Sequence, residues 1–559
     1  MSILIVVNRS FRKIGQSVYF PMLFLGVFIA AVYGKFLWNP VVFDDIYFFD
    51  GSVHKEYLEK VFSFDLRWLP YATFEWTREL LGLDLIWFHL GNNLLHIANT
   101  ILLFVFLRKL FETVIPDSDV LTNASTSTIN ILSSKWTAFF SALIFAMHPA
   151  AVYAVTYLSQ RSTLMATCFV LIMLNTLLLG LVRRSGWYFF ASSVAYLFAV
   201  LSKEHAIMAP AVALALLFLI KKPSRQLLRE VLPTFVLYGL IALFVVYQYK
   251  SRSILGQAYE ISGNSMLSRL AQIHPEFNPE SAYPLSILTQ SFLFFKYLLL
   301  WILPSPAWMS VDMKEGFATT FLSWPQTVGL FAFILYPVVA VYLLIKGHAK
   351  GLLGFAMLFP WLLFATEFSA VRIQESFVLY RSYLWMIGIF AAAPFLLQKL
   401  SAKRAVWVMT AIAILMIPLT WERLTTFTHP LLLWDDAARL IENKDAIPGA
   451  ERIYHNRGLN FARLKMYPQA LKDYDKALLI YPEYPYAYND RGALYFATGE
   501  YKKALIDFTK AAELDNQYAK PYLGLAKTYE AIGELDAARL NYKKLCAFGV
   551  AYGCKNSGS

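Results

Sequence analysis

The sequence predicts an all-α protein in which a multi-pass membrane domain precedes a C-terminal solenoid of helix pairs. Of its 559 residues, 58% are hydrophobic and 16% are aromatic, and this apolar share exceeds that of soluble domains. The apolar residues gather in blocks of roughly 18 to 22, which is the length of helix that crosses a bilayer. Near the C-terminus these blocks end, and a pattern with a period of 34 residues begins.

The apolar blocks predict eleven transmembrane helices within a domain that covers residues 1–421. The first block begins near Tyr19 and has no small-residue cleavage site, so we interpret it as a retained anchor and not as a signal peptide. The predicted helices cover residues 17–38, 87–107, 136–156, 163–182, 186–202, 205–220, 231–249, 325–346, 351–368, 383–399 and 404–421.

Basic residues occur at alternate ends of these blocks and predict the topology. Examples are Arg12 and Lys13 before the first block, and Arg183 and Arg184 after the fourth. Short cytoplasmic loops carry an excess of lysine and arginine, so these loops are expected inside. The net charge of +12 is therefore interpreted as a topology signal, and no nucleic acid is expected as a partner. The loop after the first helix is then outside.

Residues 284–304 form a further apolar block that we expect to lie in the plane of the membrane, on its outer side. If this block crossed the bilayer, the basic loops at 346–350 and 399–404 would face outward, against the usual charge distribution. An interfacial helix with Lys296 at its polar edge avoids this conflict. Eleven transmembrane helices then place the C-terminus outside, which for a bacterial inner membrane is the periplasm.

The composition changes near residue 422 to that of a soluble domain. Residues 422–450 are interpreted as a connecting partial repeat, and residues 451–559 contain three repeats at 451–484, 485–518 and 519–552 with a C-terminal cap. Small residues where two helices touch, with aromatic residues wedged beside them, are typical of tetratricopeptide repeats. Such a solenoid presents a concave surface, which we expect to dock a protein. The residues in register are Tyr454, Tyr488 and Tyr522; Gly458, Gly492 and Ala526; Phe461, Tyr495 and Tyr529; Ala470, Ala504 and Ala538; and Tyr474, Phe508 and Tyr542.

Local motifs extend across nearly the whole chain in a characteristic order. They are "FDD" at 43–45, "RWLPYATFEW" at 67–76, "FHLGNNLLH" at 88–96, "HPAAVYAVTYLSQRSTLMA" at 148–166, "LSKEHA" at 201–206 and "YRSYL" at 380–384. With the repeats, the chain resembles the multispanning GT-C glycosyltransferases. The resemblance is to the branch that includes the animal transmembrane and tetratricopeptide-repeat O-mannosyltransferases and their bacterial relatives.

This resemblance implies that the protein takes a sugar from a polyprenyl phosphate and transfers it outside the membrane. It also implies that an acidic residue in the first outer loop is catalytic, a position that Asp44 and Asp45 occupy. A carboxylate within hydrogen-bond reach of an acceptor hydroxyl can take its proton as the oxygen attacks the sugar. We favour Asp44 as this base. The alternative is that the two aspartates cap a helix beside the membrane.

A lipid phosphate that gains negative charge as it leaves requires preorganised cations. Four basic residues at the predicted outer ends of helices are candidates for this role: Arg161, Lys203, Arg372 and Arg381. Charges at membrane depth usually face a cavity or an opposite charge. The alternatives are pairing of Lys203 with Glu204, pairing of Arg381 with Glu375, and contact of Arg161 with lipid headgroups.

Further polar residues are expected to support this site or the acceptor groove: Arg67, His89, Asn92, His96, Gln160, Glu204 and Asp312. His89, Asn92 and His96 share one helical face, but two turns separate the two histidines by roughly 10 Å, which is too far for a shared ion. They are expected to hydrogen-bond to the first-loop carboxylates or to neighbouring helices. No acidic pair indicates a metal, so no cofactor is assigned, and metal dependence stays open.

Cys546 and Cys554 flank "AFGVAYG" at the end of the third repeat. If the repeats lie outside, these cysteines are in an oxidising compartment, where disulfides persist. The pattern also resembles the bridged cysteine pairs of Sel1-like helical repeats. We therefore predict a disulfide, with two free thiols as the alternative.

These observations predict a glycosyltransferase that modifies hydroxyl groups of an extracytoplasmic acceptor, expected to be Ser or Thr of a protein. Its expected partners are the lipid bilayer, the polyprenyl-phosphate sugar and an acceptor protein docked by the repeats. One alternative acceptor is a glycolipid or envelope polysaccharide. An alternative of another class is a non-catalytic membrane scaffold, or a translocase of lipid-linked sugars, that recruits partners through its repeats.

Overall fold

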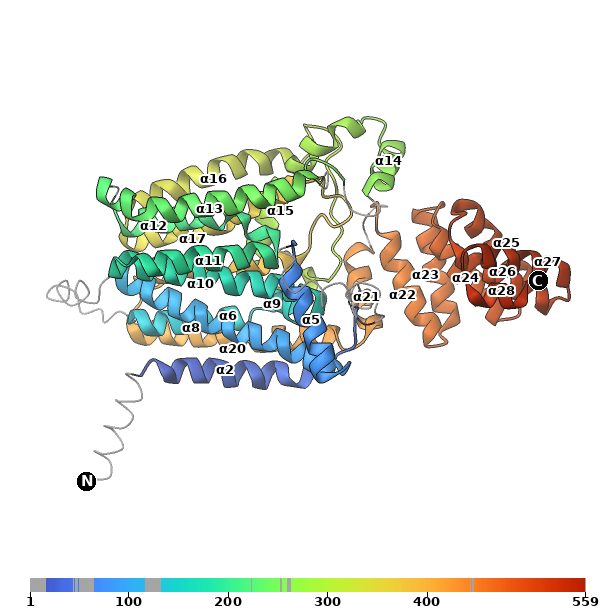
Figure 1. Cartoon of the computed structure of the whole chain (residues 1–559), viewed down its shortest axis with the longest axis horizontal. Coiled ribbons are helices and arrows are strands. Elements are labelled where there is room, and N and C mark those ends of the chain that lie inside the picture. The colour runs from blue at the N-terminus through green and yellow to red at the C-terminus, as the bar shows by residue number, and fades with distance from the viewer. Residues whose placement is uncertain are drawn as a thin grey trace, which may run out of the picture. The chain divides into compact units, whose positions relative to one another are not determined.

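The computed structural model describes residues 17–43, 45, 49, 65–115, 132–222, 224–251, 254–258, 263–442, 444 and 447–557. All the regular elements assigned within these residues are helices (Figure 1). The chain divides into two compact units. A bundle unit comprises Met1–Leu267, His274–Val311 and Phe317–His429, and a repeat unit comprises Ser268–Ile273, Asp312–Gly316 and Pro430–Ser559.

The bundle unit is built from helices of very different lengths, which run along one another in Figure 1. The α-helices are α2 (Tyr19–Tyr33), α5 (Trp68–Leu81), α6 (Leu85–Val114), α8 (Ser134–Ala146), α9 (Pro149–Thr156), α10 (Arg161–Arg183), α11 (Gly186–Ser202), α12 (Ala209–Ile220), α13 (Arg225–Ser251), α14 (Gly263–Ile273, whose end joins the repeat unit), α15 (Ala282–Ile302), α16 (Gln326–Lys346), α17 (His348–Phe364), α18 (Ser382–Met386), α19 (Ala393–Leu397) and α20 (Ala402–Thr426). Short 3₁₀ helices that matter below are η3 (Leu158–Gln160), η4 (Glu204–Met208), η7 (Ala365–Ser369) and η8 (Leu379–Arg381).

Within the described residues, nine helical segments are long and apolar enough to cross a membrane, or ten if the bent pair α8 and α9 is one span. This pair bends by 60° where His148 precedes Pro149. Proline at the first position of α9 cannot continue the hydrogen bonding of α8. The side chain of His148 caps the new helix by accepting from the backbone N–H of Ala150.

Two predicted transmembrane helices are short, and one predicted in-plane helix is long. The segments Gly186–Ser202 and Glu204–Ile220 are apolar but fall below the length of the nine candidates, whereas Pro279–Ile302 is among the nine. α15 packs inside the bundle, because the ring of Phe294 lies 5.2 Å from those of Phe333 in α16 and Phe364 in α17. Length and composition therefore do not separate an in-plane helix from a spanning one here, and the in-plane orientation stays a prediction.

The repeat unit consists of consecutive antiparallel helix pairs, and their bounds agree with the predicted repeats. Its helices are α21 (Pro430–Ile441), α22 (Glu451–Arg463), α23 (Tyr467–Ile480), α24 (Pro485–Ala497), α25 (Tyr501–Leu514), α26 (Ala519–Ala531), α27 (Leu535–Ala547) and α28 (Ala551–Asn556). A side chain at Gly458 would approach the ring of Tyr474 to 2.9 Å, and one at Gly492 would approach that of Phe508 to 3.1 Å. Small residues at these positions let each aromatic ring wedge between the two helices of its repeat.

Candidate functional site

A polar cavity of about 190 Å³ in the bundle unit brings together residues from distant parts of the chain. Its lining carries four cationic side chains and one carboxylate, so positive charge dominates. The lining residues are Arg67, Tyr71, Ser159, Gln160, Ser162, Lys203, His205, Arg372, Glu375, Tyr380 and Arg381. They come from the start of α5, the junction of η3 and α10, the junction of α11 and η4, and the segment that ends in η8.

Among the cations that line this cavity, Lys203 differs in that its hydrogen bonds go to neutral groups. Its ammonium donates to Oε1 of Gln160 at 2.9 Å and to Oγ1 of Thr163 at 2.6 Å. No ion pair of Lys203 with a carboxylate is found within the described residues, and its ammonium lies 5.6 Å from the centre of the Tyr380 ring. Burial, with Arg67 adding and Glu204 opposing, lowers the pKa of Lys203 to about 7. An added anion would restore its charge.

Glu204, the neighbour of Lys203, pairs instead with Arg67. Nε of Arg67 donates to Oε2 of Glu204 at 3.0 Å, and a second, very short contact joins the other oxygen. Arg67 has a left-handed backbone conformation with φ of 65° at the N-terminus of α5. This pairing joins residues that are 137 positions apart in the sequence, and it leaves Lys203 directed to Gln160.

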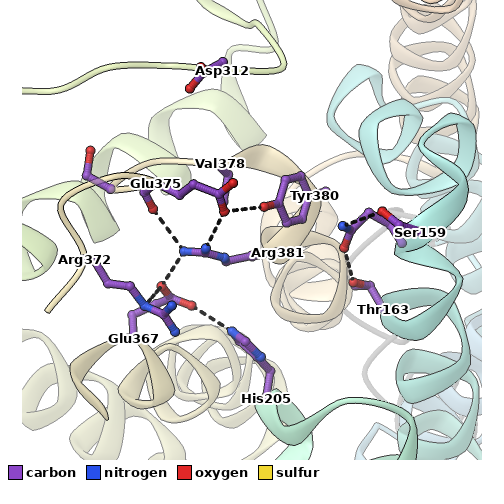
Figure 2. Close-up of polar contacts among 12 residues, drawn as sticks. Ser159, Thr163, His205, Asp312, Glu367, Arg372, Glu375, Val378, Tyr380 and Arg381 are labelled. Carbon is purple, nitrogen blue, oxygen red and sulfur yellow. Dashed lines mark hydrogen bonds and ion pairs between the residues drawn. The ribbon is translucent and has the colours of Figure 1, made fainter. Parts of the chain in front are cut away.

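Arg381 is the centre of a branched network of charges (Figure 2). It donates to Oε2 of Glu367 at 3.1 Å and to Oε2 of Glu375 at 2.9 Å, and Tyr380 donates to the same oxygen of Glu375. The other oxygen of Glu367 lies 3.1 Å from Nε2 of His205, and Nε of Arg372 lies 3.4 Å from Glu367. The pairing of Arg381 with Glu375, the alternative to phosphate contact in the sequence analysis, is thus present, and Arg381 also lines the cavity.

A second, mainly apolar cavity of about 200 Å³ shares residues with the polar one. His205 and Arg372 line both, and the remaining apolar wall is built from α13, the end of η4 and η7. Val245 and Val246 of α13 and Met208 of η4 contribute to it. A polar, cation-rich space and an apolar space therefore meet at the same two side chains.

The predicted catalytic pair is described only in part, because Asp44 lies outside the described residues. Asp45 is 1% exposed and accepts hydrogen bonds from the backbone N–H groups of Leu158 at 3.1 Å and Ser159 at 2.8 Å. Its carboxylate therefore binds the beginning of η3, in the manner of a helix cap. Ser159 itself lines the polar cavity, so this contact ties the first predicted outer loop to the wall of the cavity.

Arg161 is buried and makes several contacts outside the lining of the polar cavity. Its guanidinium donates to Oδ1 of Asn92 at 3.0 Å and to the carbonyl of Phe88 at 2.9 Å, and it stacks on the ring of Phe74 at 4.0 Å. These contacts join α10 to α6 and α5. Arg161 therefore connects three helices in this structure. Its neighbour in the sequence, Gln160, lines the polar cavity.

The polar face of α6 bonds to neighbouring backbone and side chains, as the spacing predicts. His89 lies 3.0 Å from the carbonyl of Asn39, and Asn92 donates to the carbonyl of Val155. His96 lies 2.7 Å from the hydroxyl of Tyr383 and 3.1 Å from the carbonyl of Ala146. Among the described residues, no group of three or more His, Cys, Asp or Glu side chains is arranged to hold a metal ion.

Asp312 belongs to the repeat unit, where it is buried in an ion-pair cluster. Its carboxylate lies 3.0 Å from Nζ of Lys314 and accepts from Nη2 of Arg452 at 2.8 Å. Burial would raise the pKa of Asp312, but Arg452 and Lys314 together hold it below its ordinary value. In the same unit Arg269 donates to Oε1 of Glu451 at 2.8 Å. Asp312 and Arg269 thus fix two connecting segments to the first repeat.

A disulfide joins Cys546 of α27 to Cys554 of α28. Gly549, with a φ of +77°, makes the turn between these helices, a conformation that glycine adopts without strain. The pairing expected from the sequence is therefore present in the structure, and it holds the last helix against the third repeat.

The sequence alone did not single out His205 or Tyr71, although both line the polar cavity. His205 directly follows Lys203 and Glu204 in "LSKEHA". Three consecutive ionisable residues between two apolar blocks could have indicated that His205 belongs to the site. Tyr71 lies one helical turn after Arg67, and the same face of α5 could have indicated it.

Comparison with known proteins identifies one part of the chain. The family model described as tetratricopeptide repeat matches residues 449–517, which contain almost all of the first two predicted repeats. The C-terminal part of this protein therefore contains tetratricopeptide repeats. No curated protein matches the chain.

Proposed function

We propose that this protein is a multi-pass membrane glycosyltransferase that uses a polyprenyl-phosphate sugar as donor and transfers the sugar to hydroxyl groups of an acceptor outside the cytoplasm. The observation that carries this proposal is the pair of cavities that meet at His205 and Arg372, one lined by cations and one apolar. An anionic head and a hydrocarbon chain joined in one molecule match such a pair. The resemblance to GT-C glycosyltransferases supports the same donor.

In this proposal Lys203 binds the phosphate, and the network around Arg381 holds the positive wall in place. Among the described residues the ammonium of Lys203 has only neutral acceptors, so an anionic oxygen would gain a strong charge-assisted hydrogen bond there. Arg372 and Arg381 both lie against Oε2 of Glu367. Their pairing keeps both guanidinium groups ordered while positive charge still dominates the lining.

We assign the general base to Asp44. Both oxygens of Asp45 accept from the backbone of η3, which favours a structural role for Asp45, and the resemblance supports an acidic residue of this loop as the base. The repeats support a protein acceptor, because solenoids of this kind present extended surfaces to other proteins. A glycolipid or polysaccharide acceptor is the second candidate, and it uses the same donor site.

Comparative mass spectrometry tests the function. The glycans of secreted and envelope proteins are compared between cells that contain the protein, cells that lack it and cells that carry Asp44→Asn. We expect a class of O-linked glycans on Ser or Thr to be lost in the second and third strains. Loss restricted to glycolipid or polysaccharide would favour the second acceptor. An unchanged inventory in both strains would contradict an enzyme and favour a membrane scaffold or a translocase.

A further inference from the structure

His205 is the titratable group of the site that the proposed mechanism does not yet use. It lines both cavities, and its side chain is 9% exposed. Its Nε2 lies 3.1 Å from Oε1 of Glu367, whereas its Nδ1 makes no hydrogen bond among the described residues and lies 3.6 Å from Oε1 of Glu204. A ligand that approaches Nδ1 would complete the hydrogen bonding of this ring.

The surroundings of Glu367 decide which nitrogen carries hydrogen. Arg381 donates to Glu367, and Arg372 lies 3.4 Å away. A carboxylate between two guanidinium groups is ionised and can only accept hydrogen bonds. Nε2 of His205 is therefore the donor to Glu367, and Nδ1 is the nitrogen that can meet a ligand. A histidine oriented in this way by a carboxylate is a general arrangement for moving protons.

We propose, on the basis of the proposed function, that His205 is the proton-binding group of the phosphate site: its Nδ1 takes up a proton and donates a hydrogen bond to the phosphate that the sugar leaves. In the transfer step the acceptor oxygen bonds to the anomeric carbon, and its proton passes to the carboxylate base. The bond between that carbon and the phosphate oxygen breaks, and the electron pair stays on the oxygen. A phosphodiester with one negative charge thus becomes a monoester dianion. The proton that balances the added charge enters from solvent and binds at Nδ1.

Charged groups on several elements surround His205 and affect proton uptake at its ring. Oε1 of Glu204 lies 3.6 Å from Nδ1, and this carboxylate and Glu367 favour the imidazolium. The opposing cations are Lys203 on the same segment, Arg67 bonded to Glu204, and Arg372 and Arg381 on the facing segment. α13 contributes only Val245 and Val246 at this point. Glu375, which also lines the polar cavity, is a further carboxylate on the facing segment. A dianion that arrives here adds negative charge beside the ring and favours a hydrogen bond donated by Nδ1.

Calorimetry of a short polyprenyl monophosphate, farnesyl phosphate, tests this inference on the full chain in detergent. Titration at about pH 8 in two buffers of different ionisation enthalpy gives the number of protons taken up on binding. Lys203 also titrates near this pH, so the experiment uses Lys203→Arg, whose side chain stays charged. We expect this variant to take up close to one proton for each bound lipid by linkage. We expect the double variant with His205→Gln to bind with clearly less uptake.

The matched control and the outcomes separate this inference from the proposed function. His274 is an exposed histidine with its Nδ1 3.1 Å from Glu276, and His274→Gln should leave proton uptake unchanged. Binding of farnesyl phosphate without proton uptake by Lys203→Arg would overturn the role of His205, as would equal uptake after His205→Gln. Failure of the wild-type chain to bind farnesyl phosphate at all would overturn the proposed donor site instead. Proton uptake by Lys203→Arg alone tests the role of His205 even if the double variant with His205→Gln does not fold.

Discussion

Buried charges are arranged differently in the two units. In the repeat unit, Arg457 donates two hydrogen bonds of 2.8 Å to Asp473, and Arg491 makes the same two bonds to Asp507, 34 positions further on. Each carboxylate is matched by one guanidinium in bidentate geometry. The repeated spacing shows that these pairs belong to the internal structure of each helix pair.

In the bundle unit the charges around Glu367 form a branched network that does not recur along the chain. Glu367 is shared by Arg372, Arg381 and His205, and within the described part of the chain Lys203 hydrogen-bonds to neutral oxygen atoms alone. All but Glu367 also line the polar cavity. We interpret the bidentate Arg–Asp pairs of the repeat unit as stabilising contacts. We interpret the branched network of the bundle unit, with Lys203 bonded to neutral oxygen atoms, as a site for an anionic ligand. The predictions below test this distinction.

The largest effect is expected from Asp44→Asn, which should lower sugar transfer by roughly 10² to 10⁴ with unchanged membrane insertion, because an amide cannot accept the hydroxyl proton. Turnover of purified protein with a polyprenyl-phosphate sugar provides the measurement. Asp45→Asn is the matched control, and it should lower stability more than turnover since its carboxylate binds the backbone of η3. Wild-type turnover by both variants would show the catalytic assignment to be wrong.

The next effect concerns Lys203. Lys203→Gln should weaken binding of the lipid donor by roughly 10- to 100-fold, the value of one charge-assisted hydrogen bond, with little change in acceptor affinity. Saturation curves against each substrate measure the two effects. Lys346→Gln, at the end of α16 and close to the ring of Tyr342, is the control and should bind donor normally. A selective loss of acceptor affinity in Lys203→Gln would place Lys203 in the acceptor groove.

A third prediction compares the bidentate Arg–Asp pairs with a surface pair. Arg491→Met leaves the buried carboxylate of Asp507 unmatched and should lower the free energy of unfolding by about 2 to 3 kcal/mol. Arg539→Met removes the partner of the fully exposed Asp536 and should cost less than about 1 kcal/mol. Denaturant unfolding followed by limited proteolysis of the repeats gives both values. Equal costs would contradict a structural role of the repeated pairs.

The smallest effect is expected for the disulfide. Cys546 and Cys554 are eight positions apart, so the bond closes a short loop, and Cys546→Ser should lower stability by less than about 3 kcal/mol. Peptide mapping of protein from native membranes without reductant should find the two cysteines linked. Free thiols at both positions, together with labelling of the repeats only from the cytoplasmic side, would contradict the predicted outward location of the repeats.

The sequence predicted the repeats well because their contacts are local and periodic. Gly458 and Tyr474 lie in one helix pair, and the same contact recurs after 34 positions. The bend at Pro149 was also predictable, since proline interrupts a helix through its own backbone. The segment 383–399, predicted as one transmembrane helix, lies largely in the candidate span Leu379–Leu397, which is built from consecutive short helices of two kinds, a detail that apolar composition does not report.

The sequence predicted several residues of the candidate site but not the contacts between them. The sequence singled out Lys203, Arg372 and Arg381 and left pairing of Lys203 with its neighbour Glu204 as an alternative, whereas Glu204 bonds to Arg67 at a separation of 137 positions. His205 and Glu367 are 162 positions apart. Contacts between residues so far apart in the sequence depend on how the helices pack, and no local sequence pattern predicts them. Arg161 illustrates the same limit, because its contact with Asn92 and Phe88 depends on the approach of α6 and α10.

Donor binding to the purified wild-type chain tests the central claim most directly. The full protein carries a photoreactive amino acid in place of Tyr71, in the polar cavity, and is mixed with a radiolabelled polyprenyl-phosphate sugar in liposomes. We predict cross-linking that unlabelled donor displaces and that Lys203→Gln reduces, while the same amino acid at Tyr342 captures no label that the donor displaces. Equal labelling at both positions, or labelling that is insensitive to Lys203→Gln, would contradict a lipid-phosphate site in this cavity.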